Sequence, residues 1–303
     1  MTTTTSPALS VPVPHRAERA VRPARTHRER PSLWGTLILL VGAAYCLFPV
    51  LWVVMASTKS ASELFSTFTL APSTHLPENV VDLSQYRGGI YWRWMANTAL
   101  YAGVGGLASV VVSAMAGYGL AKFQFRGKKA VFNVILAGVL VPGVVLAIPQ
   151  YLLLAQVGLT NTYWSVLLPS VISPYGIYLA RIYAAASVPD DVLEAARTDG
   201  AREGRIFTSI AVPMMVPGLV TIFLFQFVAI WNNFMLPYIM LGDDRLFPIT
   251  VGLSGLLNQG ASQPAMYTSV ITGALLSIVP LAALFLTLQR FWQVDLAAGA
   301  VKA

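Results

Sequence analysis

Six long apolar segments alternate with shorter polar ones along this chain. A helix that rises 1.5 Å per residue crosses the roughly 30 Å hydrocarbon core of a bilayer in about 20 residues, and each segment reaches that length. The pattern predicts an all-α membrane protein with six transmembrane helices, at residues 33–56, 96–121, 130–156, 163–183, 214–241 and 267–289.

Two of the predicted crossings carry a further pattern. In the second, a small residue recurs every fourth position, at Gly105, Ser109, Ser113 and Gly117, which allows a neighbouring helix to pack closely. In the third, Pro142 and Pro149 are expected to kink or break the helix, because proline has no N–H to donate to the preceding turn. Before the second crossing, Tyr91, Trp92 and Trp94 are typical of an aromatic belt at the membrane interface.

The distribution of cations orients the predicted helices. Of the 20 Lys and Arg residues, sixteen fall on one side of the six-helix arrangement and four on the other, namely Lys59, Arg87, Arg93 and Arg245. Because short cytoplasmic loops carry the excess of Lys and Arg, both termini are expected in the cytoplasm. The chain then divides into a disordered basic tail (1–32), the first crossing (33–56), an extracellular loop (57–95), a membrane core (96–290) and a C-terminal tail (291–303).

Composition excludes several classes of function. Apolar residues make up 56% of the chain and charged residues 11%, and the net charge of +7 is concentrated in the tail that precedes the first crossing, where it suits a membrane surface and not nucleic acid. The single cysteine, Cys46, and three scattered histidines offer no disulfide or metal site. No A-x-A site follows the first apolar segment, which favours a retained anchor over a cleaved signal peptide.

The predicted crossings also limit the source of energy. Residues 130–180 contain no Asp, Glu, Lys or Arg, and the single such residue in the six crossings is Arg181, near the end of the fourth, whereas proton-driven carriers commonly place such groups at membrane depth. No G-x-x-x-x-G-K-[ST] phosphate loop is present, and no paired nucleophile and base suggests an enzyme. We therefore expect a non-enzymatic chain with no cofactor of its own, which obtains its energy from another subunit.

The most highly charged segment between two crossings is residues 189–213. Asp191 and Glu194 have the D-x-x-E spacing of a helix capping box, and Gly200 is expected to end that helix. A second helix is predicted from the apolar positions Ile206, Phe207, Ile210 and Ala211, which share one face. On this evidence alone, the segment is either a docking element for a partner or an amphipathic linker whose Glu194 only caps a helix.

The same segment resembles a known family, the membrane-spanning permease subunits of binding-protein-dependent ABC importers. The resemblance rests on Glu194-Ala195-Ala196, then Gly200, then Ile210-Ala211-Val212-Pro213, with Val212 where the family has Leu. It implies a type I importer permease fold and a coupling loop (Glu194, Ala195, Ala196, Gly200, Ile210 and Pro213) that docks on an ATP-hydrolysing partner. It also implies a second, homologous permease, an ATPase homodimer that holds ATP and Mg, an extracellular binding protein, and a location in the plasma membrane of a prokaryote.

A second resemblance concerns the cargo. Residues Ala229 to Phe234 followed by Pro237, and the closing run Ala298 to Lys302, look like the carbohydrate-importing branch, with Asn233 where Asp is frequent. The resemblance implies a sugar, with an oligosaccharide favoured, and a pathway lined by Trp231, Asn232, Asn233 and Gln226. The amides of Asn232 and Asn233 would equally serve to tie helices together. Amino acids, peptides and polyol phosphates remain alternative cargoes, and an ATP-independent secondary carrier is an alternative machine.

The predicted outer loop from Gly242 to Met266 is expected to contact the binding protein. It resembles the loop that family members extend toward that partner, and Gly252, Gly255 and Gly260 would make it mobile. Ser254 and Asn258 are the expected contact positions.

Overall fold

The computed structural model describes residues 33–68, 70–289 and 291, and it contains helices and no strands in those residues. The all-α prediction is therefore confirmed for this part of the chain. The helices before the bundle core are α1 (Leu33–Ser57), α2 (Ala61–Ser66), α3 (Leu76–Gln85) and the 3-10 turn η1 (Tyr86–Gly88). Then follow α4 (Ile90–Lys122), α5 (Lys128–Leu140), α6 (Gly143–Gln156), α7 (Tyr163–Val171), α8 (Pro174–Ser187), α9 (Asp190–Thr198), α10 (Glu203–Ile206), the π-helical η2 (Phe207–Ala211), α11 (Val212–Trp231), α12 (Met235–Met240), the 3-10 turn η3 (Asp244–Leu246), α13 (Ile249–Gln259) and α14 (Ala265–Leu288).

The chain forms two compact units, residues 1–47 and 48–303. The first contributes the described residues 33–47, which form the N-terminal part of α1. The predicted tail at 1–32 and all of the predicted tail at 291–303 except Phe291, including Ala298 to Lys302, lie outside the described residues.

Five helical segments are long and apolar enough to cross a membrane, and the pair α5 and α6 makes a sixth if the two count as one bent span. The predicted third crossing is broken at Val141 and Pro142, where α5 and α6 meet at 106°. The break at Pro142 is confirmed. Pro149 was expected to contribute to it, but it lies inside an unbroken α6.

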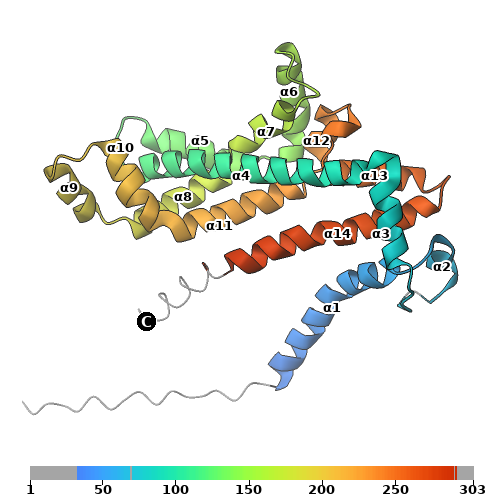
Figure 1. Cartoon of the computed structure of the whole chain (residues 1–303). Coiled ribbons are helices and arrows are strands. Elements are labelled where there is room, and N and C mark those ends of the chain that lie inside the picture. The colour runs from blue at the N-terminus through green and yellow to red at the C-terminus, as the bar shows by residue number, and fades with distance from the viewer. Residues whose placement is uncertain (1–32, 69, 290, 292–303) are drawn as a thin grey trace, which may run out of the picture. The chain divides into compact units, whose positions relative to one another are not determined.

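Helix α4 is the centre of this unit, with α8 and α11 packed along it (Figure 1). The predicted stripe of small residues faces those neighbours. A Cβ at Gly117 would lie 2.5 Å from Ala180 Cβ, and one at Gly105 would lie 3.3 Å from Ile230 Cδ1. Since a real Cβ cannot approach a neighbour at 2.5 Å, the helices can pack this closely only because the stripe lacks larger side chains. This prediction is confirmed.

The start of α4 corrects the expected position of the second crossing. The helix begins at Ile90, six residues before the predicted boundary, and takes up the three aromatic residues assigned to the interface. Only Trp92 is exposed, at 47%, whereas Tyr91 and Trp94 are buried. Their polar atoms reach backbone carbonyls far along the chain, Tyr91 Oη donating to Gly273 O at 2.9 Å and Trp94 Nε1 to Asp244 O at 2.8 Å. For these two, the belt prediction is wrong, because each indole or phenol donor finds a partner inside the fold.

The predicted fifth crossing, 214–241, is also wrong at its far end. Helix α11 stops at Trp231, Asn232 and Asn233 form a break, and α12 is a separate short helix. Asparagine competes with the helical backbone for hydrogen bonds, and here the Asn233 side chain accepts one from Leu236 N, 3.4 Å away, at the start of α12.

The segment expected to be a mobile loop after Gly242 is instead well ordered. Helix α13 forms its middle part, and Gly252 and Gly260 are positions of close packing, against the rings of Trp94 and Tyr267. Before α13, the backbone is held by α4: the Asn97 amide donates to Arg245 O and Phe247 O at 2.9 and 3.0 Å. The expectation that Gly252 and Gly260 supply mobility is wrong.

Candidate functional site

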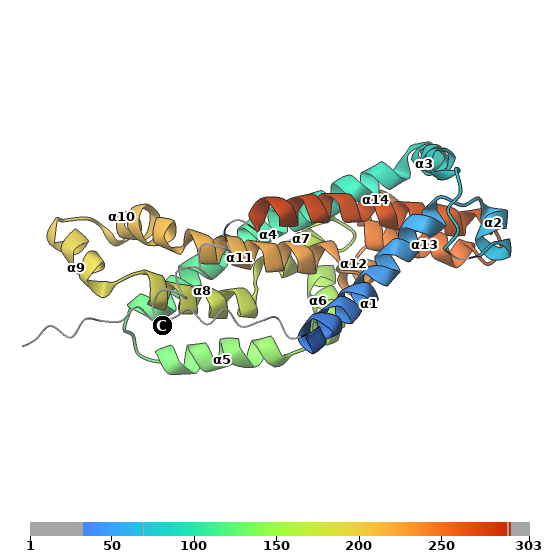
Figure 2. The same ribbon diagram turned by 90° about the horizontal axis from the view of Figure 1, so that it is seen from below.

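Helices α9 and α10 form a hairpin that projects at one end of the bundle, between α8 and α11 (Figure 2). Gly200 ends α9 in the left-handed conformation, with φ of 81°. Gly200 N donates to Arg197 O and Ala201 N to Ala196 O, both at 3.0 Å, which is the pattern of a Schellman motif. The prediction that Gly200 ends this helix is therefore confirmed.

The start of α9 differs from the predicted capping box. The N-cap residue is Pro189, which has no side-chain acceptor, and Asp191 and Glu194 lie within the helix. The carboxylate of the first helical residue, Asp190, binds the Lys122 ammonium at 2.8 Å instead. Acidic residues in this first turn still face the positive end of the helix dipole, so their enrichment has a physical reason without a capping bond.

One face of the hairpin packs on the bundle and the other is free. Leu193 is buried and Ala196 half-buried, in a cluster that includes Tyr118, Ile206 and Met215. Glu194 and Ala195 are exposed on α9, as is Pro213 beyond the hairpin in the first turn of α11, while Ile210 is half-buried. The residues Glu194-Ala195 thus present a small, acidic surface on a helix whose opposite face is fixed.

Two ion pairs hold the hairpin in place. The Lys122–Asp190 pair joins the end of α4 to the start of α9, with the Lys122 side chain 7% exposed and that of Asp190 75% exposed. The hydrogen bond from Lys122, reinforced by its charge, holds the pKa of the Asp190 carboxyl below its usual value. Within the hairpin, Arg197 Nε donates to Glu203 Oε1 at 2.7 Å. These pairs tie α9 to α10 and α9 to α4.

The hairpin is continuous with a long helical segment of the bundle. Residues Glu203 to Trp231 form one helical segment through α10, η2 and α11. The π-helical turn lies just before Pro213, where the chain lacks one backbone donor. At 1.5 Å per residue, this 29-residue segment is about 43 Å long, so it reaches from the exposed hairpin to the break at Asn232.

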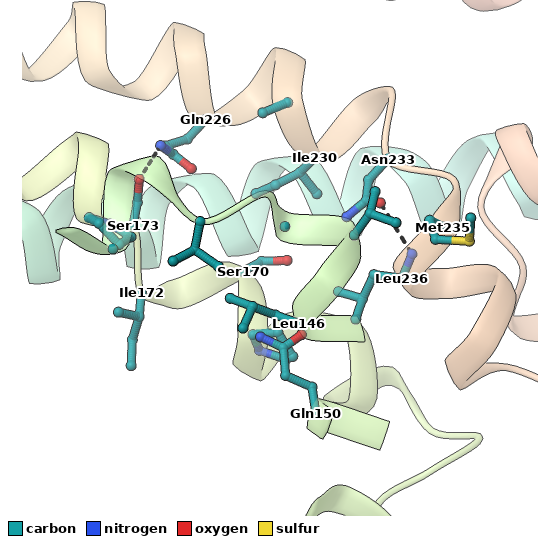
Figure 3. A pocket seen from close by; sticks show the side chains of 17 residues that line it. Leu146, Gln150, Ser170, Ile172, Ser173, Gln226, Ile230, Asn233, Met235 and Leu236 are labelled. Carbon is teal, nitrogen blue, oxygen red and sulfur yellow. Dashed lines mark hydrogen bonds between the residues drawn. The ribbon is translucent and has the colours of Figure 1, made fainter. Parts of the chain in front are cut away.

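A groove of about 420 Å³ lies where three helix breaks meet (Figure 3). The breaks separate α5 from α6, α7 from α8, and α11 from α12. The polar side chains in its wall are those of Gln150, Ser170, Ser173, Gln226 and Asn233. The other lining residues are Gly138, Val141, Gly143, Val144, Leu146, Pro169, Ile172, Pro174, Ala229, Ile230, Met235 and Leu236.

The groove offers neutral hydrogen-bonding groups on apolar walls. Gln226 Nε2 donates to Ser173 Oγ at 2.5 Å, which leaves the Gln226 carbonyl oxygen as an acceptor (Figure 3). Ser173 also accepts from Gly176 N at 3.0 Å and so caps α8. No lining residue is ionisable. Such a surface suits an uncharged ligand with several hydroxyl groups.

The structure separates the four predicted pathway residues. Gln226 and Asn233 line the groove, but Trp231 and Asn232 do not. Trp231 is 3% exposed, and its indole stacks on the Phe227 ring with 5.4 Å between the ring centres. The Asn232 side-chain amide donates to Val228 O, in the last turn of α11. The idea that Trp231 offers a free ring face to a sugar is not supported by this geometry.

Sequence reasoning missed Gln150, Ser170 and Ser173. Ser173 had a detectable signal, since Ser before Pro174 has the pattern of an N-cap followed by a first helical residue. Gln150 and Ser170 had none, because their place in the groove depends on how α6 and α7 fold back at the breaks.

At the opposite end of the bundle, α13 carries the two expected contact positions (Figure 2). Asn258 is exposed and Ser254 is half-buried. Nearby, a pocket of about 430 Å³ is crossed by an ion pair between Arg87 Nη2 and Asp244 Oδ2, 2.6 Å apart.

Comparison with known proteins places these features in a family. The model of the binding-protein-dependent transport system inner membrane component matches residues 109–293. The arabinooligosaccharides transport system permease protein of Halalkalibacterium halodurans is 32% identical over 272 residues, with 88% of this chain and 96% of that protein covered. The lactose transport system permease protein of Rhizobium radiobacter is 30% identical, with 87% and 94% covered.

Among solved structures, a chain of a bacterial ABC transporter involved in the import of the acidic polysaccharide alginate aligns with a TM-score of 0.73. The alignment covers 85% of this chain and 94% of that one, at 22% sequence identity. This likeness establishes the fold, which is that of an ABC importer permease.

Proposed function

The chain belongs to the binding-protein-dependent transport system inner membrane components, and we propose from this premise that it is the permease subunit of an ATP-driven sugar importer. It is a multi-pass membrane protein with the importer permease fold. Its relatives named for arabinooligosaccharide and lactose transport support a sugar as cargo. An oligosaccharide is the favoured size.

The chemistry of the groove supports an uncharged sugar. Amide and hydroxyl groups hydrogen-bond sugar hydroxyls, and the apolar walls accept the faces of sugar rings. A phosphorylated or acidic cargo would be expected to meet a cation, and none lines the groove. We therefore assign Gln150, Gln226 and Asn233 to the sugar pathway.

The assembly that we propose has four further chains. A homologous permease completes the pathway, two copies of an ATPase hold ATP and Mg, and a binding protein delivers the sugar from outside. Both termini of this chain lie in the cytoplasm, in keeping with the six spans counted when α5 and α6 form one. The chain itself catalyses no reaction.

The single observation that carries the coupling role is the exposed Glu194-Ala195 surface on a hairpin fixed to α4 and continuous with α11. When the ATPase subunits close, they displace this hairpin. The continuous helix to Trp231 then moves one wall of the groove, so that sugar access alternates between the two sides.

A charge reversal tests this role. Glu194→Lys is expected to leave assembly in the membrane normal and to abolish both sugar uptake and the stimulation of ATP hydrolysis by the loaded binding protein, because the docking surface becomes cationic. Glu78→Lys, the same change at an exposed position in α3, is the matched control and is expected to have little effect. Wild-type uptake and stimulation in Glu194→Lys would refute the coupling role.

A further inference from the structure

A basic pocket is lined by residues of α5, of α8 and of the turn before α5. Helix α5 starts toward the end of the bundle that carries α9 and α10 (Figure 2). We propose that this pocket binds the anionic headgroup of a phospholipid. Its volume is about 480 Å³, and it is lined by Gln124, Phe125, Gly127, Lys128, Lys129, Phe132 and Arg181. The inference does not depend on the cargo of the transporter.

The charge of this pocket is not balanced by the chain. Lys128, Lys129 and Arg181 line it, and no Asp or Glu does. Lys128 Nζ donates to Phe123 O at 2.9 Å, and the Arg181 guanidinium lies 4.0 Å from the centre of the Phe132 ring. These partners are neutral, and none of the four ion pairs found among the described residues includes the three cations. A phosphate group would supply the missing negative charge and accept several charge-assisted hydrogen bonds.

The start of α5 strengthens the attraction for an anion. This 13-residue helix begins after Gly127, which has a positive φ of 85° and makes no side-chain capping bond. The first turn therefore presents its partial positive charge without a capping acceptor. The helix end alone would not define a site, but here it opens into a pocket that already holds three cations.

An apolar stripe leads away from the pocket and favours a lipid over a soluble anion. Lys128 and Phe132 lie one turn apart on α5, and the next positions on that face are Leu136 and Leu140. Leu136 is 40% exposed and Leu140 80% exposed. The same helix thus offers a cationic site for a headgroup and, further along the apolar segment, a surface for acyl chains. Under the proposed orientation, the lipid belongs to the cytoplasmic leaflet.

The test uses the assembled transporter in nanodiscs. The association of spin-labelled phosphatidylglycerol is measured by electron paramagnetic resonance and compared with that of spin-labelled phosphatidylcholine. Wild type is expected to prefer phosphatidylglycerol, and Lys129→Gln and Arg181→Gln each to reduce the preference about fivefold, the effect typical of one basic residue near an anionic surface. Lys129→Arg is expected to retain the preference.

Arg126→Gln is the matched control, because Arg126 lies in the same basic turn and does not line the pocket. An equal loss in Arg126→Gln would show nonspecific attraction and overturn the site. Equal association of the two lipids with wild type would also overturn it. If inorganic phosphate or glycerophosphoglycerol displaces the labelled lipid at millimolar concentration, the pocket binds a soluble anion and the lipid assignment is wrong. If the variants lose their ATPase subunits and wild type shows no lipid preference, the pocket is a protein contact and the proposal fails.

Discussion

Gly252 shows how one missing side chain decides the packing of a helix. A Cβ at this position would lie 2.2 Å from the Trp94 ring, and the ring is held in turn by its bond to Asp244 O. Trp94 cannot give way without breaking that bond. The glycine is therefore required by packing in α13, although it costs helix propensity.

A pair of substitutions tests this packing. Gly252→Ala is expected to destabilise the protein by about 1–3 kcal/mol, the usual cost of overpacking a core. Gly255→Ala, three residues along α13 with no atom within 4 Å of its added Cβ, is expected to be neutral or slightly stabilising. Thermal unfolding of the purified protein measures both. Equal unfolding temperatures for the two variants would contradict the close contact.

Substitutions in and just after α11 are expected to differ in effect according to whether the residue lines the groove or lies in the core. Gln226→Leu removes an amide from the groove and is expected to reduce sugar uptake for each assembled complex severalfold. Trp231→Ala removes a buried ring and is expected to cost about 3–5 kcal/mol, so that assembly and uptake fall together. Asn232 is exposed and does not line the groove, so Asn232→Leu is expected to change neither assembly nor uptake appreciably. The ratio of uptake to assembled complex separates the outcomes. If this ratio is lowered in Trp231→Ala and normal in Gln226→Leu, then Trp231 lines the sugar path and Gln226 does not.

At the scale of elements, an ion pair with unequal burial joins α4 to α9. Lys122 is nearly enclosed by the protein, whereas Asp190 is in contact with solvent. The pair fixes the start of α9 relative to α4, and the packing of Leu193 holds the rest of the helix.

Lys122→Gln is expected to remove the ion pair between α4 and α9 and to reduce the sugar uptake obtained per ATP hydrolysed.

The effect of Lys122→Gln on stability is expected only over a defined range of pH. Since the pKa of Asp190 is lower in the folded protein, the pair contributes stability above the ordinary carboxyl value of 3.8 and loses it as the pH falls through the lowered value. The difference in unfolding temperature between wild type and Lys122→Gln should therefore be constant from pH 8 to about 5 and close only in stronger acid. A difference that vanished near pH 6 would point to another group.

At the scale of the whole second unit, the hairpin and α13 lie at opposite ends of α4 and α11 (Figure 2). The groove is reached from the hairpin by a continuous helix, and α13 is packed against α4 near its start. This arrangement allows one end to contact an ATPase and the other to contact a binding protein.

Crosslinking tests the second of these contacts. Asn258→Cys, exposed on α13, is expected to crosslink to the binding protein in the complex trapped with ATP and vanadate, and the half-buried Ser254→Cys to do so less efficiently. The native Cys46 is replaced by Ser in both, since it is exposed. Thr208→Cys, exposed in η2 directly after the hairpin, is the negative control. Failure of both α13 positions would show that the binding protein docks elsewhere.

The sequence by itself determined the class of this protein, the number of its apolar segments, the helix that ends at Gly200 and the family motif around it. These features depend on local patterns: apolar length, a glycine in the left-handed conformation, and fixed spacing along the chain. The stripe from Gly105 to Gly117 belongs with them, because its period alone places it on one helix face.

Only the tertiary structure decided which polar residues share the groove. Gln150, Ser173 and Gln226 are far apart in the chain and meet because three helices break at the same depth of the bundle. It also decided that Trp231 is a core residue. At the start of α9, it decided that Asp190 forms an ion pair with Lys122 and that Asp191 does not cap the helix. In each case, the side chain has several partners within its chemical reach, and the long-range packing of helices, which no local pattern encodes, selects one of them.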